Sequence, residues 1–161
     1  MKHFVLSLLC LAAAPLANAS PELAQTWSAK AGDLYLQTTE HMQAYKYSSR
    51  PPLEGSYVVE LERFAYTAAQ LGSWNDAEGG AKDLGCIFRG MAEDIEVQLD
   101  TLTGKAQQNE QIAALKRLSA LLDDAQQIGP AAASAVLNAD NTGETPAACP
   151  ANPMLKIGNS F

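Results

Sequence analysis

The chain has 161 residues, of which 47% are hydrophobic and 18% are charged, and its formal net charge is −7 at pH 7. These proportions are typical of one globular domain and exclude collagen-like, low-complexity and wholly disordered chains. The Lys and Arg residues are scattered through an acidic chain, whereas nucleic-acid binding needs a basic stripe that neutralises phosphates. We therefore expect an acidic globular protein that does not bind nucleic acid.

The first 19 residues predict a signal peptide. Lys2 precedes an apolar run from Phe4 to Ala17, and Ala17-Asn18-Ala19 supplies the small residues that signal peptidase requires. A run of this length is too short to cross a bilayer of roughly 30 Å as a helix. We expect cleavage before Ser20 and a periplasmic or secreted protein without stable membrane insertion.

Two cysteines, Cys86 and Cys149, remain after the predicted cleavage. An even pair in an exported chain favours a disulfide, whereas a free catalytic thiol is disfavoured in an oxidising compartment. Neither residue belongs to a C-x-x-C motif, so zinc-ribbon, thioredoxin and covalent-haem sites lack their ligands. The sequence therefore predicts the disulfide Cys86–Cys149.

The first half of the mature chain predicts two amphipathic helices. One begins at Ser20-Pro21 and extends to about Tyr47, and the other extends from about Tyr57 to a stop at Gly72. Paired prolines in the string SSRPPLEG separate the two helices. Apolar residues recur at steps of three and four, which is the helical period. They are Leu23, Trp27, Ala31, Leu34, Thr38, Met42 and Tyr45, followed by Val58, Leu61, Phe64, Ala65, Ala68 and Leu71.

The second half predicts two more helices with the same period. The third extends from about Leu84 to Thr103-Gly104, and the fourth from about Lys105 to Ile128, where Gly129-Pro130 ends it. Their apolar positions are Leu84, Phe88, Met91, Ile95, Leu99 and Leu102, followed by Ile112, Leu115, Leu118, Leu122 and Ala125. Residues 130–140 add a short fifth helix, and the rest of the chain is expected to be irregular.

These elements predict an all-α protein in which residues 20–129 form an antiparallel four-helix bundle. Residues 130–161 are expected to form the short helix and an irregular tail, which the disulfide attaches to the bundle. At about 100° per residue, Cys86 points away from the core face of the third helix. The tail must then cross the outside of that helix. Its apolar residues either contact the helix or belong to a frayed end, and they are Met154, Leu155, Ile157 and Phe161.

Metal and haem chemistry have little support. His41 is the single mature histidine, and Met42 beside it diverges by about 100° on a helix, so the two cannot ligate one metal from the same turn. Met91 falls at a core position. Glu93, Glu96 and Asp100 share one flank of the third helix, where a solvated face is the simpler interpretation. We expect no cofactor and no metal site.

Enzyme chemistry has no complete motif in this chain. No G-x-S-x-G elbow or phosphate-binding loop occurs, and an arginine and carboxylate site would have to draw on Arg63, Arg89, Glu60 and Glu93. By elimination, the sequence favours a non-enzymatic binding or accessory protein that contacts another exported protein. The alternative is a carrier of a small ligand, haem or metal in the bundle interior.

Aromatic residues near the expected helix ends suggest where such contacts are made, although each is equally suited to close the end of the core. They are Tyr45, Tyr47, Tyr57 and Trp74. Trp27 lies on the apolar face of the first helix, which predicts a packing role.

Overall fold

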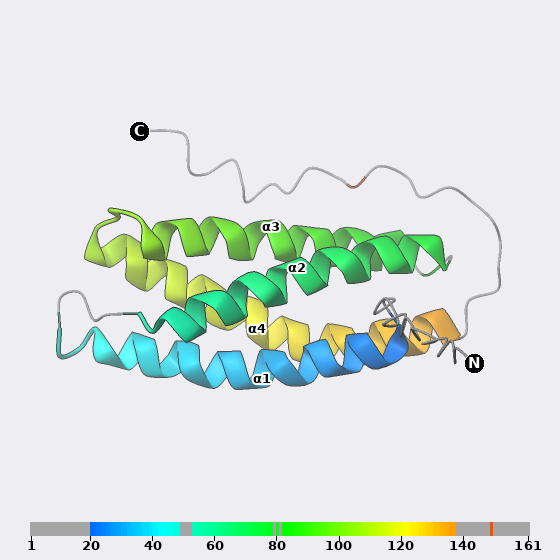
Figure 1. Ribbon diagram of the computed structural model, residues 1–161, viewed down its shortest axis with the longest axis horizontal. Helices are drawn as coiled ribbons and strands as arrows, with labels where there is room; N and C mark the ends of the chain where they lie inside the picture. Colours follow the sequence, from blue (N-terminus) through cyan, green and yellow to red (C-terminus); the bar gives the residue numbers. More distant parts are fainter. Residues whose placement is uncertain (1–19, 49–52, 79, 81, 138–148, 150–161) are drawn as a thin grey trace, which may run out of the picture.

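The computed structural model describes residues 20–48, 53–78, 80, 82–137 and 149. It contains four helices, α1 (Pro21–Ala44), α2 (Gly55–Ala77), α3 (Lys82–Thr103) and α4 (Gln108–Leu137). Each helix runs antiparallel to the one before it (Figure 1), and the described part of the chain contains no strand. The predicted four-helix bundle is confirmed. The predicted signal peptide and the tail residues Met154, Leu155, Ile157 and Phe161 lie outside the described residues.

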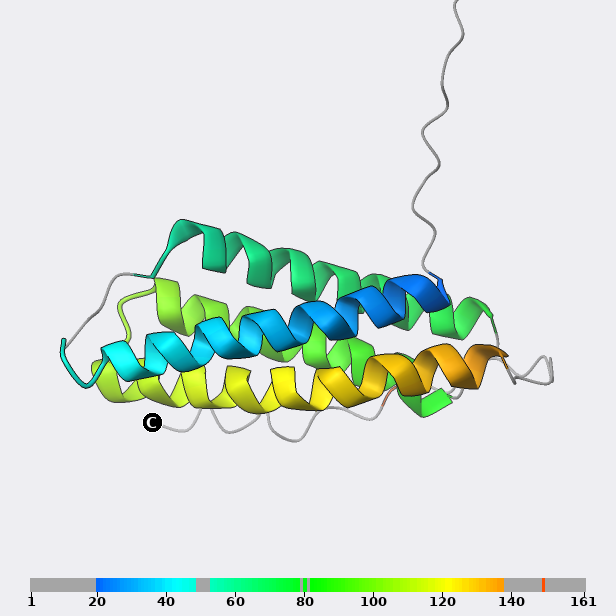
Figure 2. The same cartoon turned by 90° about the horizontal axis from the view of Figure 1, so that it is seen from below.

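The bundle consists of two close helix pairs. α1 packs closely against α4, and α2 against α3, while the α1/α2 and α3/α4 boundaries are looser. Figure 2 shows α1 lying alongside α4 over most of its length. We call the two looser boundaries the seams of the bundle. Because the helices follow one another around the bundle, the two seams lie on opposite sides of it.

Small residues bring α1 and α4 together. A Cβ atom at Gly129 would lie 2.5 Å from the backbone oxygen of Ala24 and 2.5 Å from the Cβ of Ser28, so only glycine fits this crossing. The Ser28 hydroxyl donates a 2.7 Å hydrogen bond to the backbone oxygen of Gln126. That oxygen would normally accept from residue 130, which is a proline without an N–H. Ser28 therefore replaces the hydrogen bond that Pro130 removes from α4.

This replacement corrects the predicted end of the fourth helix. α4 continues through Gly129 and Pro130 to Leu137, so residues 130–137 are its last turns and not a separate fifth helix. The prediction assumed that Pro130 leaves the backbone oxygen of Gln126 without a hydrogen-bond donor, which makes a proline inside a helix costly. Here α1 supplies that partner.

A second glycine contact explains the close α2/α3 pair. A Cβ atom at Gly72 would lie 2.9 Å from the backbone oxygen of Gly85 and 3.1 Å from Cγ of Arg89. The predicted stop at Gly72 is therefore wrong, because this glycine permits close packing in the middle of a helix that continues to Ala77. The expected start of the first helix is confirmed, since the N–H of Leu23 donates to Oγ of Ser20 over 3.2 Å.

Apolar side chains fill the centre of the bundle. Trp27 stacks on Phe64 with a centroid separation of 4.5 Å, and it contacts the edge of Phe88 at 5.3 Å. Its indole N–H donates to the backbone oxygen of Phe64 over 3.0 Å. Trp27 therefore joins three helices, and its predicted packing role is confirmed. Other predicted core residues are also buried, including Leu34, Leu61, Leu71, Ile95, Leu115, Leu118 and Leu122.

Three of the four helix-end aromatic residues contribute to the core. Tyr57 is fully buried, Tyr45 is 7% exposed, and Trp74 packs partly buried against the core, whereas Tyr47 is 89% exposed. The hydroxyl of Tyr45 donates to Oε1 of Gln111 over 2.8 Å. Tyr45 and Tyr57 thus satisfy their polar atoms inside the bundle, which excludes them as exposed contact residues in this conformation.

Candidate functional site

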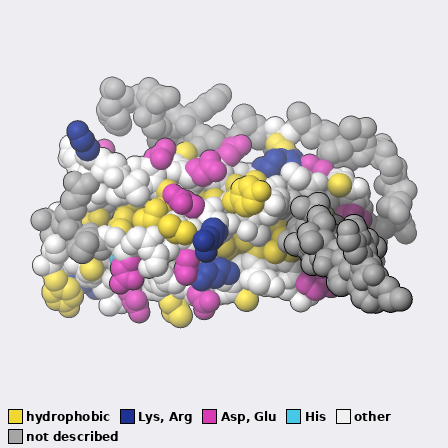
Figure 3. All heavy atoms as spheres, in the orientation of Figure 1, with side chains coloured by type: hydrophobic (Ala, Val, Ile, Leu, Met, Phe, Trp, Pro, Cys, Tyr) yellow, Lys and Arg dark blue, Asp and Glu magenta, His cyan; other side chains and the backbone are white. Residues whose placement is uncertain are grey.

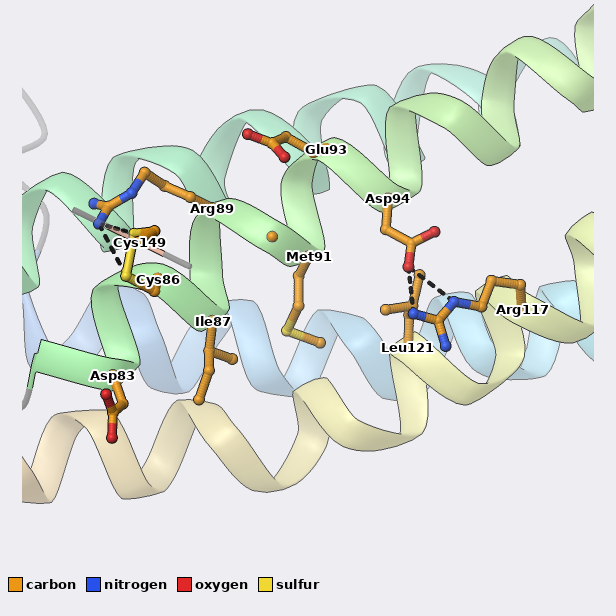
Figure 4. Close-up of a pocket in the computed structure, with 11 residues that line it drawn as sticks. Asp83, Cys86, Ile87, Arg89, Met91, Glu93, Asp94, Arg117, Leu121 and Cys149 are labelled. Atoms are coloured by element: carbon orange, nitrogen blue, oxygen red, sulfur yellow. Dashed lines mark hydrogen bonds and ion pairs between the residues drawn. A yellow bond between two sulfur atoms is a disulfide. The ribbon is translucent and has the colours of Figure 1, made fainter. Parts of the chain in front are cut away.

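A groove with a volume of about 540 Å³ follows the α3/α4 seam. α3 and α4 pack less closely along this seam than α1 and α4 do. Figure 4 shows Asp83, Ile87 and Met91 extending from α3 toward α4. We call this feature the α3/α4 groove, and it is lined by Asp83, Cys86, Ile87, Arg89, Gly90, Met91, Glu93, Asp94, Arg117, Leu121 and Cys149.

A disulfide between Cys86 and Cys149 lies at one end of the α3/α4 groove. Cys86 is half-buried on the outer side of α3, and Cys149 is exposed. The predicted pairing and the predicted outward position of Cys86 are both confirmed. The bond holds residue 149 against a helix that is 63 residues earlier in the chain.

Arg89 connects the disulfide to the close α2/α3 pair. Its Nη1 lies 2.6 Å from Oδ2 of Asp76 on α2, and its Nη2 donates to Sγ of Cys149 at 2.9 Å. The distance from Nη2 to Sγ of Cys86 is longer, 3.7 Å. Figure 4 shows the guanidinium group turned toward both sulfur atoms. These contacts could not be predicted from the sequence, because they depend on the register between α2 and α3.

A second arginine closes the other end of the groove. Nε of Arg117 on α4 donates to Oδ2 of Asp94 on α3 over 2.8 Å, and Nη2 of Arg117 pairs with the same oxygen. The other oxygen of Asp94 accepts from Nε2 of Gln98 over 2.8 Å. Asp94 is 5% exposed, so these partners compensate the cost of burying its charge.

The remaining charges of the α3/α4 groove are acidic. Asp94 is paired with Arg117, and Arg89 is paired with Asp76, whereas no ion pair joins Asp83 or Glu93 to another residue within the described ranges. Both carboxylates are exposed beside the apolar side chains of Ile87, Met91 and Leu121. Among the described residues, the groove therefore combines an apolar lining with two carboxylates that no ion pair compensates.

A smaller groove of about 280 Å³ follows the α1/α2 seam. Nζ of Lys30 lies 2.9 Å from Oε2 of Glu60, which also accepts from Nε2 of Gln37 over 3.3 Å. The hydrogen bond from Lys30 is the main cause of a lowered pKa at Glu60. Figure 3 shows basic and acidic side chains side by side at the middle of the face formed by α1 and α2. This seam therefore has its charges largely paired.

The structure separates the four residues of the nominal enzyme site. Glu60 and Arg63 line the α1/α2 groove, whereas Arg89 and Glu93 line the α3/α4 groove on the opposite side of the bundle. No single site draws on all four. The expected arginine and carboxylate site is therefore not assembled.

The side chains considered as metal ligands either pack against other side chains or are exposed to solvent. The His41 ring lies 4.5 Å from the ring of Tyr57, while Met42 and Met91 pack against the core. Burial lowers the pKa of His41, and the nearby carboxylates of Glu54 and Glu40 oppose that effect. The flank residues Glu93, Glu96 and Asp100 are exposed. Among the described residues, no group of three or more His, Cys, Asp and Glu side chains is placed to hold a metal ion.

Comparison with protein-family models, curated proteins and solved structures gave no match to this chain. Within the described ranges, no helix combines the length and the apolar character needed to span a membrane. Functional inference therefore depends on the grooves themselves.

Proposed function

We propose that the protein is an exported, non-enzymatic binding protein that contacts another exported protein through the α3/α4 groove. The observation that carries this proposal is the composition of the groove. Apolar side chains line it, two carboxylates without an ion-pair partner among the described residues border it, and a disulfide closes one end. Such a combination suits a protein surface that offers an apolar anchor surrounded by basic groups.

Export is supported by two independent features. The N-terminal sequence has the charge, apolar core and small-residue site of a signal peptide. The disulfide between Cys86 and Cys149 is compatible with an oxidising compartment, where such bonds persist. An exported protein meets its partners outside the cytoplasm, so we expect the partner to be exported as well.

The bundle interior supports the alternative function, a ligand or haem carrier, less well than the grooves support surface contact. Trp27, Phe64 and Phe88 occupy its centre in mutual contact, and aliphatic side chains fill the layers beside them. A carrier needs an internal space lined by its ligand contacts. Both grooves described above lie at the seams and open to solvent, which favours contact at the surface.

The chemistry of the groove defines the expected partner. Ile87 is 39% exposed, and it is the apolar side chain of the groove that a partner reaches most directly. Asp83 and Glu93 attract lysine or arginine side chains and repel anionic surfaces. We therefore expect a partner that places one apolar residue over Ile87 and cations near the two carboxylates.

Matched substitutions test this proposal. Ile87→Asp places a charge in the α3/α4 groove, whereas Leu36→Asp makes the same change on α1 at a site that is 62% exposed and outside the groove. Each variant is purified from the native host, and the co-purifying proteins are quantified. We expect Ile87→Asp to reduce one partner by about tenfold or more, as loss of an interface anchor does. Equal recovery with both variants would refute the groove as the contact site.

A further inference from the structure

We propose that Cys86–Cys149 is a site of thiol–disulfide exchange, in which Cys149 is the leaving sulfur and Arg89 stabilises its thiolate. The observation is the unequal position of the guanidinium group. Nη2 of Arg89 lies 2.9 Å from Sγ of Cys149 but 3.7 Å from Sγ of Cys86. A cation beside one sulfur favours the thiolate of that sulfur, and a stabilised thiolate leaves faster.

The bundle holds this guanidinium group in place. Asp76 pairs with Nη1 at 2.6 Å, which leaves Nη2 directed at the disulfide. The side chain passes beside Gly72, where a Cβ atom would lie 3.1 Å from Cγ of Arg89. Arg89 is also partly buried, so its interaction with the sulfur is screened less than that of a free surface arginine. The stabilising charge is therefore present before exchange begins.

The α3/α4 groove gives an external thiol access to the bond. Both cysteines line this groove, and Cys86, whose sulfur is attacked, is half-buried and not enclosed. Asp83 and Glu93, which have no ion pair with another described residue, repel thiols that carry additional negative charge. The groove therefore favours reagents that carry no additional negative charge. Among these we assign the substrate as a dithiol, because the second thiol of such a reagent resolves the mixed disulfide that the first one forms.

The exchange proceeds in two balanced steps. The first thiolate of the dithiol attacks Sγ of Cys86, forms a mixed disulfide with it and breaks the Cys86–Cys149 bond. The electron pair of the broken bond remains on Sγ of Cys149, which becomes a thiolate held by Arg89. The second thiolate of the dithiol then attacks the first sulfur of the same dithiol, which is bonded to Cys86 in the mixed disulfide. The bond to Cys86 breaks, and Cys86 leaves as a thiolate. The protein gains two electrons, and the dithiol is oxidised to a disulfide.

Exchange would change the α3/α4 groove. Cys149 lines the groove and is attached to α3 through this bond, so opening the bond releases that lining residue from its covalent anchor. This inference concerns the chemistry of the bond and does not depend on the identity of the proposed partner.

The site of attack is tested first on the unmodified, oxidised protein. Folded protein is exposed briefly to a limiting amount of 2-mercaptoethanol, a neutral monothiol whose first attack gives a mixed disulfide, and free thiols are alkylated at once with iodoacetamide, before a second thiol reduces that product. Peptide mass mapping is expected to find mercaptoethanol on Cys86 and the alkyl group on Cys149. The opposite distribution, or equal amounts of both products, would overturn the assignment of Cys149 as leaving group.

The role of Arg89 is tested by rates. Reduction by dithiothreitol is expected to be about tenfold slower in Arg89→Gln, because the leaving thiolate loses a charge-assisted hydrogen bond. Arg89→Lys, which keeps the charge, should recover part of the rate. Unfolding of a variant would expose the bond and accelerate its reduction, so a slower rate cannot arise from loss of the fold. If circular dichroism shows Arg89→Gln to be folded, a rate equal to or above that of the unmodified protein would refute the role of Arg89.

Discussion

Thr38 and Tyr57 form a fully buried polar pair between α1 and α2. Their side-chain oxygens lie 2.8 Å apart, and the Thr38 hydroxyl also donates to the backbone oxygen of Leu34 over 2.7 Å. Because Thr38 uses its proton on Leu34, Tyr57 is the donor of the shared bond. Burial raises the pKa of Tyr57 to about 12, so the phenol keeps its proton at neutral pH.

We expect the two halves of this pair to respond unequally to mutation. Tyr57→Phe removes the donor and leaves Thr38 bonded to Leu34, at a cost of about 1 kcal/mol in the free energy of unfolding. Thr38→Val leaves a buried phenol without this acceptor, which costs more, about 1–3 kcal/mol. Urea denaturation of both variants measures the difference. A larger loss of unfolding free energy in Tyr57→Phe than in Thr38→Val would contradict the assignment of Tyr57 as the donor of the shared hydrogen bond.

His41 predicts a specific dependence of stability on pH. Burial beside Tyr57 lowers its pKa in the folded state, so the unfolded chain binds the proton more readily. Its contribution is therefore fully present above the unfolded value of about 6.5 and is lost as the pH falls toward the lower folded value. We expect the melting temperature to decrease from pH 7.5 to pH 5, and to decrease less in His41→Gln. Equal decreases would show that His41 does not contribute.

At the scale of helices, local sequence predicted which faces are buried but not where two of the helices end. The apolar period placed Leu34, Leu61, Ile95 and Leu118 in the core, because that period depends only on helix geometry. Gly72 and Gly129-Pro130 resemble helix ends for local reasons. Their actual role depends on contacts from other helices, which no local pattern contains.

The side-chain contacts of the candidate site could not be predicted from the sequence for the same reason. The outward position of Cys86 follows from its phase on one helix, and its pairing with Cys149 follows from there being no other mature cysteine. The contacts of Arg89 with Asp76 and the sulfurs involve three separate segments. They require the packing register of α2 on α3, which the sequence did not reveal.

Two glycines should respond in opposite directions to substitution by alanine. Gly129→Ala places a Cβ atom 2.5 Å from the backbone of α1 and is expected to cost about 1–3 kcal/mol in unfolding free energy. Gly90→Ala lies inside α3, and no described atom lies within 4 Å of its Cβ position. It should stabilise the protein by about 0.5–1 kcal/mol, because alanine favours the helix. Denaturant titration distinguishes these outcomes, and a destabilised Gly90→Ala would contradict an open position.

At the scale of the whole molecule, two close helix pairs meet along two looser seams. Each seam carries a groove and an ion pair between described residues, Lys30–Glu60 on one side and Arg117–Asp94 on the other. The α3/α4 seam differs because the disulfide attaches residue 149 beside it. This difference is the structural basis for placing the proposed contact there.

The disulfide should also contribute strongly to global stability. Closing a loop between residues 63 positions apart restricts the unfolded chain, which corresponds to roughly 4 kcal/mol in the chain-entropy model. We expect reduced protein to unfold at a distinctly lower urea concentration than oxidised protein. Coincident unfolding curves would show that this bond has little effect on the unfolded state.

Export predicts a defined N-terminus. If residues 1–19 are a signal peptide, protein isolated from the periplasm or the medium begins at Ser20, which is also the cap of α1. N-terminal sequencing of the isolated protein checks this. Recovery of the full-length chain from the cytoplasm alone would contradict export.

Site-specific photo-crosslinking tests the contact surface most directly. A photoreactive amino acid is placed at Ile87 in the α3/α4 groove or, as a matched control, at Leu36 on α1, and the cells are irradiated. We predict one discrete crosslinked partner from position 87, weakened by Asp83→Asn with Glu93→Gln, and none from position 36. Absence of a crosslink at position 87, or the same products from both positions, would contradict the proposal that the protein acts through this groove.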